Sequence, residues 1–418
     1  MHFSSILNSV RRAQSFICAH SRYGLLILLS LFLLAEVVIL VTPTTYTDEV
    51  SLNESALNVL TNCKDAPHRP TCYEKEVPKL LSSISMEAAF DVVREIQQLD
   101  PSYRFCHVLA HELGGLEVAK DPAQWFNTIP RCPSDGLCSN GCVHGAAVER
   151  FSTEVLSDAE IEIVIPDLSI ACEAREGYNP TPLDQAMCYH GIGHMGVHIT
   201  KARVEKSLEI CDRVAEKGGE KSLKRLCDEG VFMQLFQPLE PEDYALVDQL
   251  PVTPTRENLS SFCDQNGRTS EERGACWREG WPFYREDIKT AEGIVSFCAT
   301  SENDTELDHC YSTVLSIVGR TSLNGTETAQ NLCANLPEQW QGKCFSIAAG
   351  AILEEDRSRG ADAVTFCSNA PSESNQIACY DRLVAVATFI FHPTDTKLRQ
   401  LCAALPAPWR GQCTAQML

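Results

Sequence analysis

Residues 331–353 read NLCANLPEQWQGKCFSIAAGAIL, and residues 400–413 read QLCAALPAPWRGQC. In both stretches a helical pattern ends at the motif L-C-x-x-L-P, because the residue before a proline is disfavoured in the α region. A short loop then leads to a second cysteine, which opens another stretch of apolar residues at helical spacing. Each stretch therefore predicts two helices joined by a short loop and by one disulfide.

The same pairing of cysteines recurs along the whole chain. Cysteines that open a helical pattern follow one another at intervals of roughly 34–49 residues, and about 34 residues is the length of one helix–turn–helix unit. The sequence therefore predicts an all-α fold, an αα-hairpin solenoid of about ten disulfide-stapled repeats after one N-terminal transmembrane helix. The helix-opening cysteines are Cys72, Cys106, Cys142, Cys188, Cys227, Cys276, Cys310, Cys344, Cys379 and Cys413, and their predicted partners upstream include Cys63, Cys132, Cys172, Cys211, Cys263, Cys298, Cys333, Cys367 and Cys402.

One repeat departs from this pattern. Cys106 has no partner cysteine shortly upstream, whereas the next repeat has three cysteines, Cys132, Cys138 and Cys142. We therefore predict Cys132–Cys142 as the ordinary staple and Cys106–Cys138 as an extra bridge between adjacent repeats.

The cysteine count also indicates a compartment. The chain has 21 cysteines, of which Cys18 precedes an apolar stretch and the others follow it. The even number that follows suits complete pairing, and the absence of any C-x-x-C spacing argues against cysteine-bound zinc. Paired cysteines in this number predict an oxidising compartment.

The repeat length, with one disulfide in each hairpin, resembles the disulfide-bridged Sel1-like repeat proteins of bacteria. The resemblance is confined to architecture, and it implies a solenoid of stacked helix pairs. The glycine and alanine signature of those repeats is absent, as is the W-x2-L-G-x2-Y signature of tetratricopeptide repeats. The resemblance therefore implies no functional residue.

Residues 24–41, GLLILLSLFLLAEVVILV, form an apolar stretch that follows Arg11, Arg12 and Arg22. Eighteen residues at 1.5 Å rise per residue nearly span a bilayer, and basic residues on the N-terminal side place that end in the cytoplasm. We therefore predict a signal anchor, with a cleaved signal peptide as the alternative. The predicted organisation is a cytoplasmic tail (1–23), a transmembrane anchor (24–41), a connector (42–58), histidine-rich repeats with a metal site (59–240) and plainer disulfide-stapled repeats (241–418), with 42–418 in a periplasm, at a cell surface or in a secretory lumen.

The whole chain has a net charge of −21, and this acidity restricts the partners of the outer region, residues 42–418. Nucleic-acid binding needs a basic face, so no nucleic-acid partner is expected. Docking on anionic lipid is disfavoured for the same reason, and the membrane is expected as a partner only through residues 24–41.

Several of the eleven histidines lie in three successive predicted repeats, in the segments CHVLAHELGG, CVHGAAVERF and CYHGIGHMGVHI. The motif C-x-H-G occurs twice and C-x-E-G once, so His144, His190 and Glu229 occupy equivalent repeat positions. Equivalent positions on neighbouring helices lie side by side at 8–10 Å helix spacing. Glycines beside these residues, such as Gly145 and Gly230, predict a close approach of the helix backbones.

Two of the segments also carry histidines four residues apart, which share one helix face and can chelate one metal ion. Neutral imidazole suits zinc, copper and iron, and cysteines held in disulfides are unavailable for coordination. There is no H-E-x-x-H and no C-x-x-C-H, so a zincin protease and covalent haem are not expected, and non-covalent haem is a minor alternative. The predicted metal ligands are His111, His144, His190, His194 and Glu229.

Two further carboxylates occupy matching places beside the histidines. Glu112 and Glu149 align when the segments are superposed on their histidines, so we predict one or both as catalytic residues that act as a general base or orient a ligand. No motif decides between a metalloenzyme and a metal-handling protein.

A second hypothesis gives the histidines a purely structural role. The protein would then be a scaffold that binds a peptide or protein on the concave face of the solenoid. The geometry of the imidazoles separates the two hypotheses. A metal site is favoured if four imidazoles converge within about 5 Å, those of His111, His144, His190 and His194. Divergence into separate loops favours the scaffold.

Overall fold

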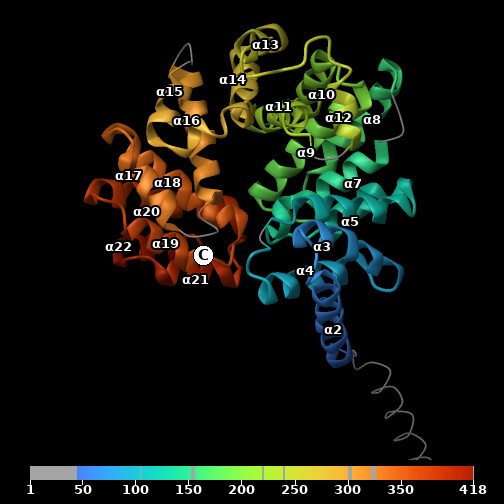
Figure 1. The fold of residues 1–418 in the computed structure, drawn as a ribbon, viewed down its shortest axis with the longest axis horizontal. Helices are drawn as coiled ribbons and strands as arrows, with labels where there is room; N and C mark the ends of the chain where they lie inside the picture. Colours follow the sequence, from blue (N-terminus) through green and yellow to red (C-terminus); the bar gives the residue numbers. More distant parts are fainter. Residues whose placement is uncertain are drawn as a thin grey trace, which may run out of the picture. The chain divides into compact units, whose positions relative to one another are not determined.

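The computed structural model describes residues 45–417 except 104, 152–155, 219–220, 239–240, 300–303 and 322–325. In this part of the chain the secondary structure is helical, apart from one isolated bridge between Arg175 and Tyr178 (Figure 1). The predicted all-α class is therefore confirmed. The chain divides into two compact units, Met1–Ser55 and Ala56–Leu418, and the arrangement below is that of the second unit.

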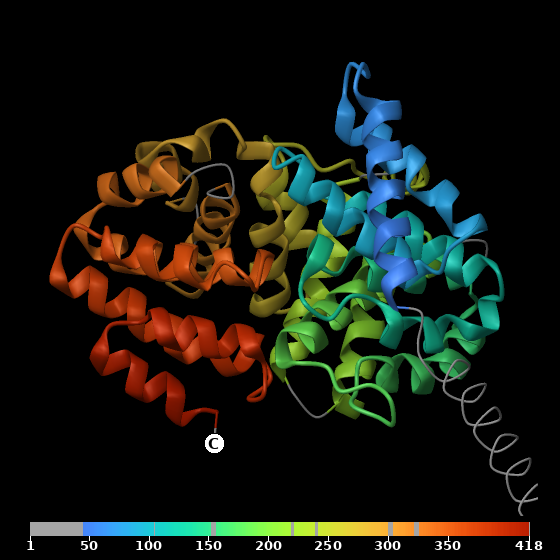
Figure 2. The ribbon, with the colours of Figure 1, turned by 90° about the horizontal axis from the view of Figure 1, so that it is seen from below.

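A row of helices runs through this unit, and each helix of the row contacts the next one along the chain. Figure 2 shows the last members of the row, in orange and red, lying side by side. The row consists of α5 (His107–Ala119), α7 (Gly141–Phe151), α9 (Pro182–Thr200), α11 (Lys221–Phe236), α14 (Ser270–Glu279), α16 (Asp304–Thr321), α18 (Glu338–Glu355) and α20 (Glu373–Ile390).

The remaining helices precede, separate or follow the members of the row, and most of them contact a member of the row. The α-helices of this kind are α2 (Thr45–Cys63), α3 (Arg69–Glu76), α4 (Met86–Leu99), α6 (Trp125–Thr128), α8 (Asp158–Ala171), α10 (Val204–Gly218), α12 (Pro241–Val247), α13 (Leu259–Asn266), α15 (Ala291–Cys298), α17 (Thr326–Asn335), α19 (Gly360–Ser368), α21 (Thr396–Ala404) and α22 (Ala407–Ala415). The 3-10 helices are η1 (Pro78–Ser82), η2 (Pro122–Gln124), η3 (Ile129–Arg131), η4 (Leu137–Asn140), η5 (Trp281–Tyr284) and η6 (Asp287–Lys289).

Helix α20 shows how sequence pattern produces a member of the row. Ser372 caps its N-terminus, where the side chain accepts a hydrogen bond from a backbone N–H of the first turn. Tyr380, Leu383, Ala387 and Ile390 follow at spacings of three and four residues, and all of them are buried. Burial of one such large apolar side chain contributes about 1.5–3 kcal/mol, so packing stabilises the helix more than its intrinsic propensity does.

Ten disulfides join the helices, in the pairing predicted from the sequence. The short-range bridges link cysteines 9–16 residues apart, and each joins a helix, or the residue after it, to the next helix along the chain, except that Cys132–Cys142 passes over η4. Cys106–Cys138 is the additional bridge, with a separation of 32 residues, and Cys132–Cys142 is the ordinary staple beside it. Disulfides in this number indicate an oxidising, extracytoplasmic environment.

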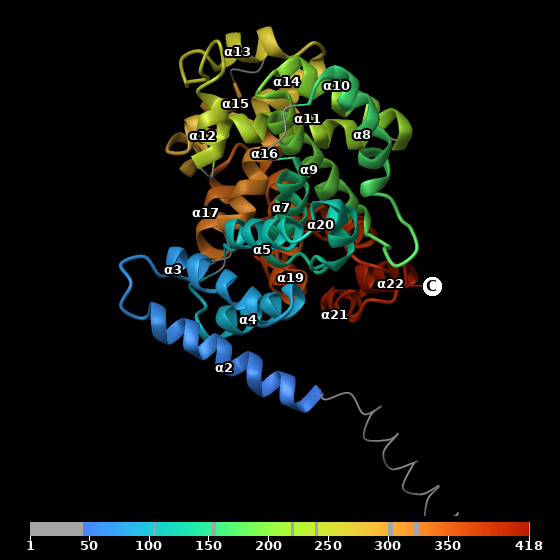
Figure 3. The same cartoon turned by 90° about the vertical axis from the view of Figure 1, so that its right-hand side faces the viewer.

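The end of the row contacts an earlier member of it. Helix α20 contacts α9 (Figure 3). Arg357, just beyond α18, forms a buried ion pair with Asp184 in the first turn of α9, at 2.5 Å. Arg357 also donates to the backbone oxygen of Ser134 at 2.5 Å, and Lys397 lies 3.5 Å from Asp135. The helices from α9 to α20 therefore form a closed circuit of contacts.

The predicted transmembrane anchor, residues 24–41, lies outside the described residues. Within the described part of the chain, no helix is both long enough and apolar enough to span a bilayer. The predicted connector, 42–58, is helical from Thr45 onward as part of α2.

Candidate metal centre

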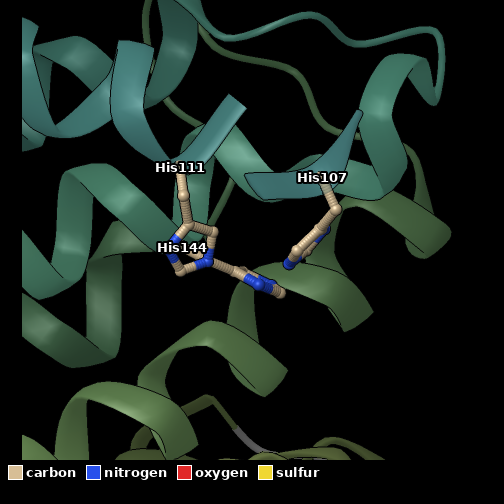
Figure 4. Close-up of side chains that lie close together, drawn as sticks. All are labelled: His107, His111 and His144. Atoms are coloured by element: carbon tan, nitrogen blue, oxygen red, sulfur yellow. The ribbon is translucent and has the colours of Figure 1, made fainter. Parts of the chain in front are cut away.

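Three histidines from α5 and α7 bring their ring nitrogens together. His107 and His111 are four residues apart on α5, and His144 comes from the first half of α7. One nitrogen from each ring lies within 4.8 Å of the other two, and the ring centroids are 5.0–5.7 Å apart. Figure 4 shows the three side chains converging beneath α5. This trio is a candidate metal centre.

Glycines allow the two helices to approach closely enough for this convergence. A Cβ on Gly145 would collide with the backbone carbonyl of His111, and a Cβ on Gly141 would collide with that of His107. Reciprocally, Gly114 on α5 lies against the backbone of Cys142. Since backbone atoms cannot rotate away, any larger residue would force the helices apart. The close approach predicted from the glycines is confirmed.

His190 and His194, on α9, continue the cluster beyond His144. Their ring centroids lie 5.7 and 5.1 Å from that of His144, and 4.8 Å from each other. Glycines again set the spacing, because a Cβ on Gly191 would lie 2.7 Å from the His144 ring. Five imidazoles therefore form a continuous chain through three consecutive helices of the row.

Hydrogen bonds fix which nitrogen of His194 carries the proton. Gln234 donates its amide Nε2–H to the carboxylate of Asp243 at 2.5 Å, so its Oε1 faces His194. This oxygen only accepts, and therefore His194 Nδ1 donates to it at 2.5 Å. The Nε2 atom of His194 keeps its lone pair, is buried and has no hydrogen-bond partner.

The same argument applies to His144. Its Nε2 lies 3.2 Å from the backbone oxygen of Met187, which only accepts, so Nε2 carries the proton. The Nδ1 atom keeps its lone pair, and it too is buried without a partner. The two unpartnered nitrogens belong to rings whose centroids are 5.1 Å apart.

Burial keeps these imidazoles neutral. Removal from water lowers the pKa of His111 and of His144 well below the usual value, and the neighbouring histidines lower both further. Burial also lowers the pKa of His194 to about 4, against the opposing effects of Gln234 and Asp243. A neutral ring offers a lone pair to a metal ion, whereas a protonated one does not, so these rings are competent ligands near pH 7.

The predicted carboxylate ligand lies in an ion-pair network. Glu229, on α11, is 2.9 Å from Arg225 and 3.2 Å from Arg278, and its carboxylate is buried while both arginines are partly exposed. Two guanidinium groups therefore already balance its charge. The assignment of Glu229 as a metal ligand stays a prediction.

The predicted catalytic carboxylates interact with each other. Glu112 is exposed and Glu149 is half-buried. Burial raises the pKa of Glu149, and repulsion from Glu112 raises it further. A raised pKa suits a proton-transfer group, and the catalytic assignment of the two carboxylates stays a prediction.

The structure adds one residue to the predicted ligand set. His107 belongs to the group with mutually close nitrogens, and it is the histidine four residues before His111 in the segment CHVLAHELGG. The predicted ligands His144, His190 and His194 are brought together, and His111 adjoins His144. Neighbouring rings in this series have centroid spacings of 4.8–5.7 Å, and only His107, His111 and His144 among the described residues form a group with mutually close ring nitrogens, so the predicted four-histidine site stays a prediction.

No protein-family model matches the chain, and no curated protein or solved structure shows significant similarity to it.

Proposed function

We propose that this protein binds a transition-metal ion with His107, His111 and His144 in an oxidising extracytoplasmic compartment. The observation that carries the proposal is the convergence of three ring nitrogens within 4.8 Å. A tetrahedral ion with bonds of about 2.0–2.1 Å separates its ligand atoms by about 3.4 Å. Small side-chain rotations bring the three nitrogens to that spacing.

The chemistry of the donors narrows the choice of ion. Neutral imidazoles suit zinc, copper and iron, and the described cysteines are held in disulfides, which removes thiolates from the ligand set. Three protein ligands also leave one coordination position for water or for a substrate, as in catalytic zinc sites. The site is therefore suited to hold an exchangeable ion or to support chemistry on it.

The proposal includes the membrane topology and the solenoid that the sequence predicts. Residues 24–41 anchor the protein in a membrane with its N-terminus in the cytoplasm, and residues 59–418 form a solenoid of disulfide-stapled helix pairs outside. Supporting this are the ten disulfides and the row of successive helix contacts.

Elemental analysis of the purified full-length chain tests the proposal. The protein carries a tag without histidine, and it is compared with a His107→Ala/His144→Ala double variant and with His68→Ala, which removes an exposed histidine. We expect close to one equivalent of zinc, copper or iron in the parent and in His68→Ala, and its loss from the double variant with an unchanged helical circular-dichroism spectrum.

Two results would overturn the proposal. One is a metal-free parent that takes up none of the three ions on equilibrium dialysis. The other is a double variant that retains as much metal as the parent.

A further inference from the structure

A second group of donor atoms lies on α9 and α11, and it contains a sulfur. The Nε2 atom of His190 is 3.2 Å from the thioether sulfur of Met233. His194 lies one helical turn beyond His190, with ring centroids 4.8 Å apart. Two buried imidazoles and one partly exposed thioether are thus linked through His190, and none of them belongs to the trio on α5 and α7.

The second group is held in place by consecutive residues of α11. Met233 contacts His190, while the next residue, Gln234, accepts the hydrogen bond from His194 Nδ1 and is itself anchored on Asp243. A histidine whose second nitrogen donates to an oxygen that is in turn hydrogen-bonded is the usual arrangement behind a metal-binding imidazole. His194 Nε2, which is buried and without a partner, is then available as the metal-binding atom.

The spacing of α9 and α11 is adapted to this group. A Cβ on Gly230 would collide with the backbone oxygen of His190, and a Cβ on Gly193 would collide with that of Cys227. The two helices therefore approach as closely as α5 and α7 do. This approach lets residues of α11 reach both histidines of α9.

We propose that His190 Nε2, His194 Nε2 and Met233 Sδ bind a monovalent copper ion at a second position beside the histidine trio. Thioether sulfur is a soft ligand that selects Cu(I), and imidazole binds copper well. Zn²⁺ instead favours the all-nitrogen trio, because thioether is not among its usual ligands. The two positions therefore differ in the ion that they prefer.

Metal titrations of the full-length chain test this second position. Cu(I) is titrated without oxygen against a chromogenic Cu(I) chelator, and Zn²⁺ is titrated separately, for the parent and for Met233→Leu. Leucine replaces methionine at nearly constant volume, so the fold is retained. The matched control is Met195→Leu. Met195 is a buried methionine on α9, the helix that carries His190 and His194.

We expect Met233→Leu to weaken Cu(I) binding at least tenfold and to leave Zn²⁺ binding within twofold of the parent. Met195→Leu should match the parent for both ions. X-ray absorption of the Cu(I) form should detect sulfur beside nitrogen in the parent and only nitrogen in Met233→Leu.

Equal Cu(I) affinities of Met233→Leu and the parent would overturn the inference and leave the His107/His111/His144 site intact. The contact with Met233 would then be a structural hydrogen bond. If the parent binds Zn²⁺ but Cu(I) binding does not depend on Met233, only this inference fails, whereas the proposed function fails only if zinc, copper and iron all fail to bind, so the two failures are distinguishable.

Discussion

Two ring nitrogens, His144 Nδ1 and His194 Nε2, are buried without hydrogen-bond partners. Leaving a polar atom in this state costs about 1–3 kcal/mol. A metal ion that accepts these lone pairs removes the cost, and because it binds only the folded chain, it adds its own binding free energy to the stability. The same atoms that weaken the metal-free protein therefore favour metal uptake.

A second buried polar group, on α11, is a carboxylate. Asp228 accepts a hydrogen bond from Lys224 at 2.7 Å through one oxygen, and its other oxygen has no hydrogen-bond partner. Burial raises the pKa of Asp228 to about 7, Lys224 opposes this, and the nearby carboxylates Glu272 and Asp212 add to it. The folded protein therefore keeps a proton on Asp228 that the unfolded chain releases at about pH 4.

We predict that Asp228→Asn weakens the pH dependence of stability. Between about pH 4 and 7 the folded state binds one more proton than the unfolded chain, so the free energy of unfolding falls as the pH rises, by about 1.4 kcal/mol per unit. The variant lacks this proton, and the fall between pH 5 and 8 should shrink by about 3 kcal/mol. Denaturant unfolding at both pH values measures it.

The control for this experiment is Asp264→Asn, which changes an exposed carboxylate on α13. It should keep the pH dependence of the parent. An Asp228→Asn protein with the same pH dependence as the parent would contradict the prediction.

At this scale the sequence pointed to the histidines that the structure brings close together, but not to all of the residues that contact them. The spacing of His107 and His111 was visible, because residues four apart share a helix face. The ion pair between Glu229 and Arg225 has the same spacing, but Arg278 approaches from another helix 49 residues along the chain. The contact of Met233 with His190 likewise depends on the angle and distance between two helices, which residue spacing does not contain.

The helices α5 and α7 illustrate how one missing side chain can determine the contact between two elements. Gly145 lies against the carbonyl carbon, the oxygen and the Cα of His111, none of which can rotate aside. The pairing of α9 with α11 repeats this through Gly230 and His190. A glycine inside a helix lowers the stability of that helix by about 1 kcal/mol relative to alanine, and the close packing that glycine allows offsets this loss.

We predict that Gly145→Ala lowers the free energy of unfolding by about 1–3 kcal/mol, because the added methyl group pushes α5 and α7 apart. The same displacement should separate His144 from His107 and His111 and weaken metal binding. Denaturant unfolding and Zn²⁺ titration measure the two effects.

Gly411→Ala, on α22, is the matched control, since an added Cβ there meets open space. Because alanine has a higher helix propensity than glycine, the Gly411→Ala substitution should leave the free energy of unfolding unchanged or raise it by up to about 1 kcal/mol. A Gly145→Ala protein as stable as Gly411→Ala would show that the helices adjust without strain.

Helix pairs and their disulfides were the part of the fold that the sequence predicted best. Cysteine spacing, proline at helix ends and apolar periodicity are local signals, and they located the bridges, including Cys106–Cys138. The contact of α20 with α9 was not predicted. It joins residues that are far apart in the chain, and no local pattern records such a contact.

In the second compact unit as a whole, the closed circuit of helices depends on a few polar contacts. Arg357 is buried and joins Asp184 on α9 to the end of α18. We predict that Arg357→Gln lowers the free energy of unfolding by about 3 kcal/mol, because it leaves a buried carboxylate without its cation. Denaturant unfolding with the disulfides intact measures the change.

Arg359→Gln provides the comparison. Arg359 pairs with the exposed Asp362 three residues along α19, a kind of contact worth less than about 1 kcal/mol. Similar stabilities of the two variants would mean that the Arg357 contact is no stronger than a surface pair.

Closure of the circuit also bears on how such a chain can change in length. An open stack of helix pairs can gain or lose a pair by gene duplication or deletion, because each pair contacts only its neighbours. Here a pair inserted between α11 and α18 would carry Arg357 away from Asp184 and separate α20 from α9. The number of pairs in this part of the molecule is therefore fixed by geometry, and descendants of this chain should vary in their loops rather than in their repeat count.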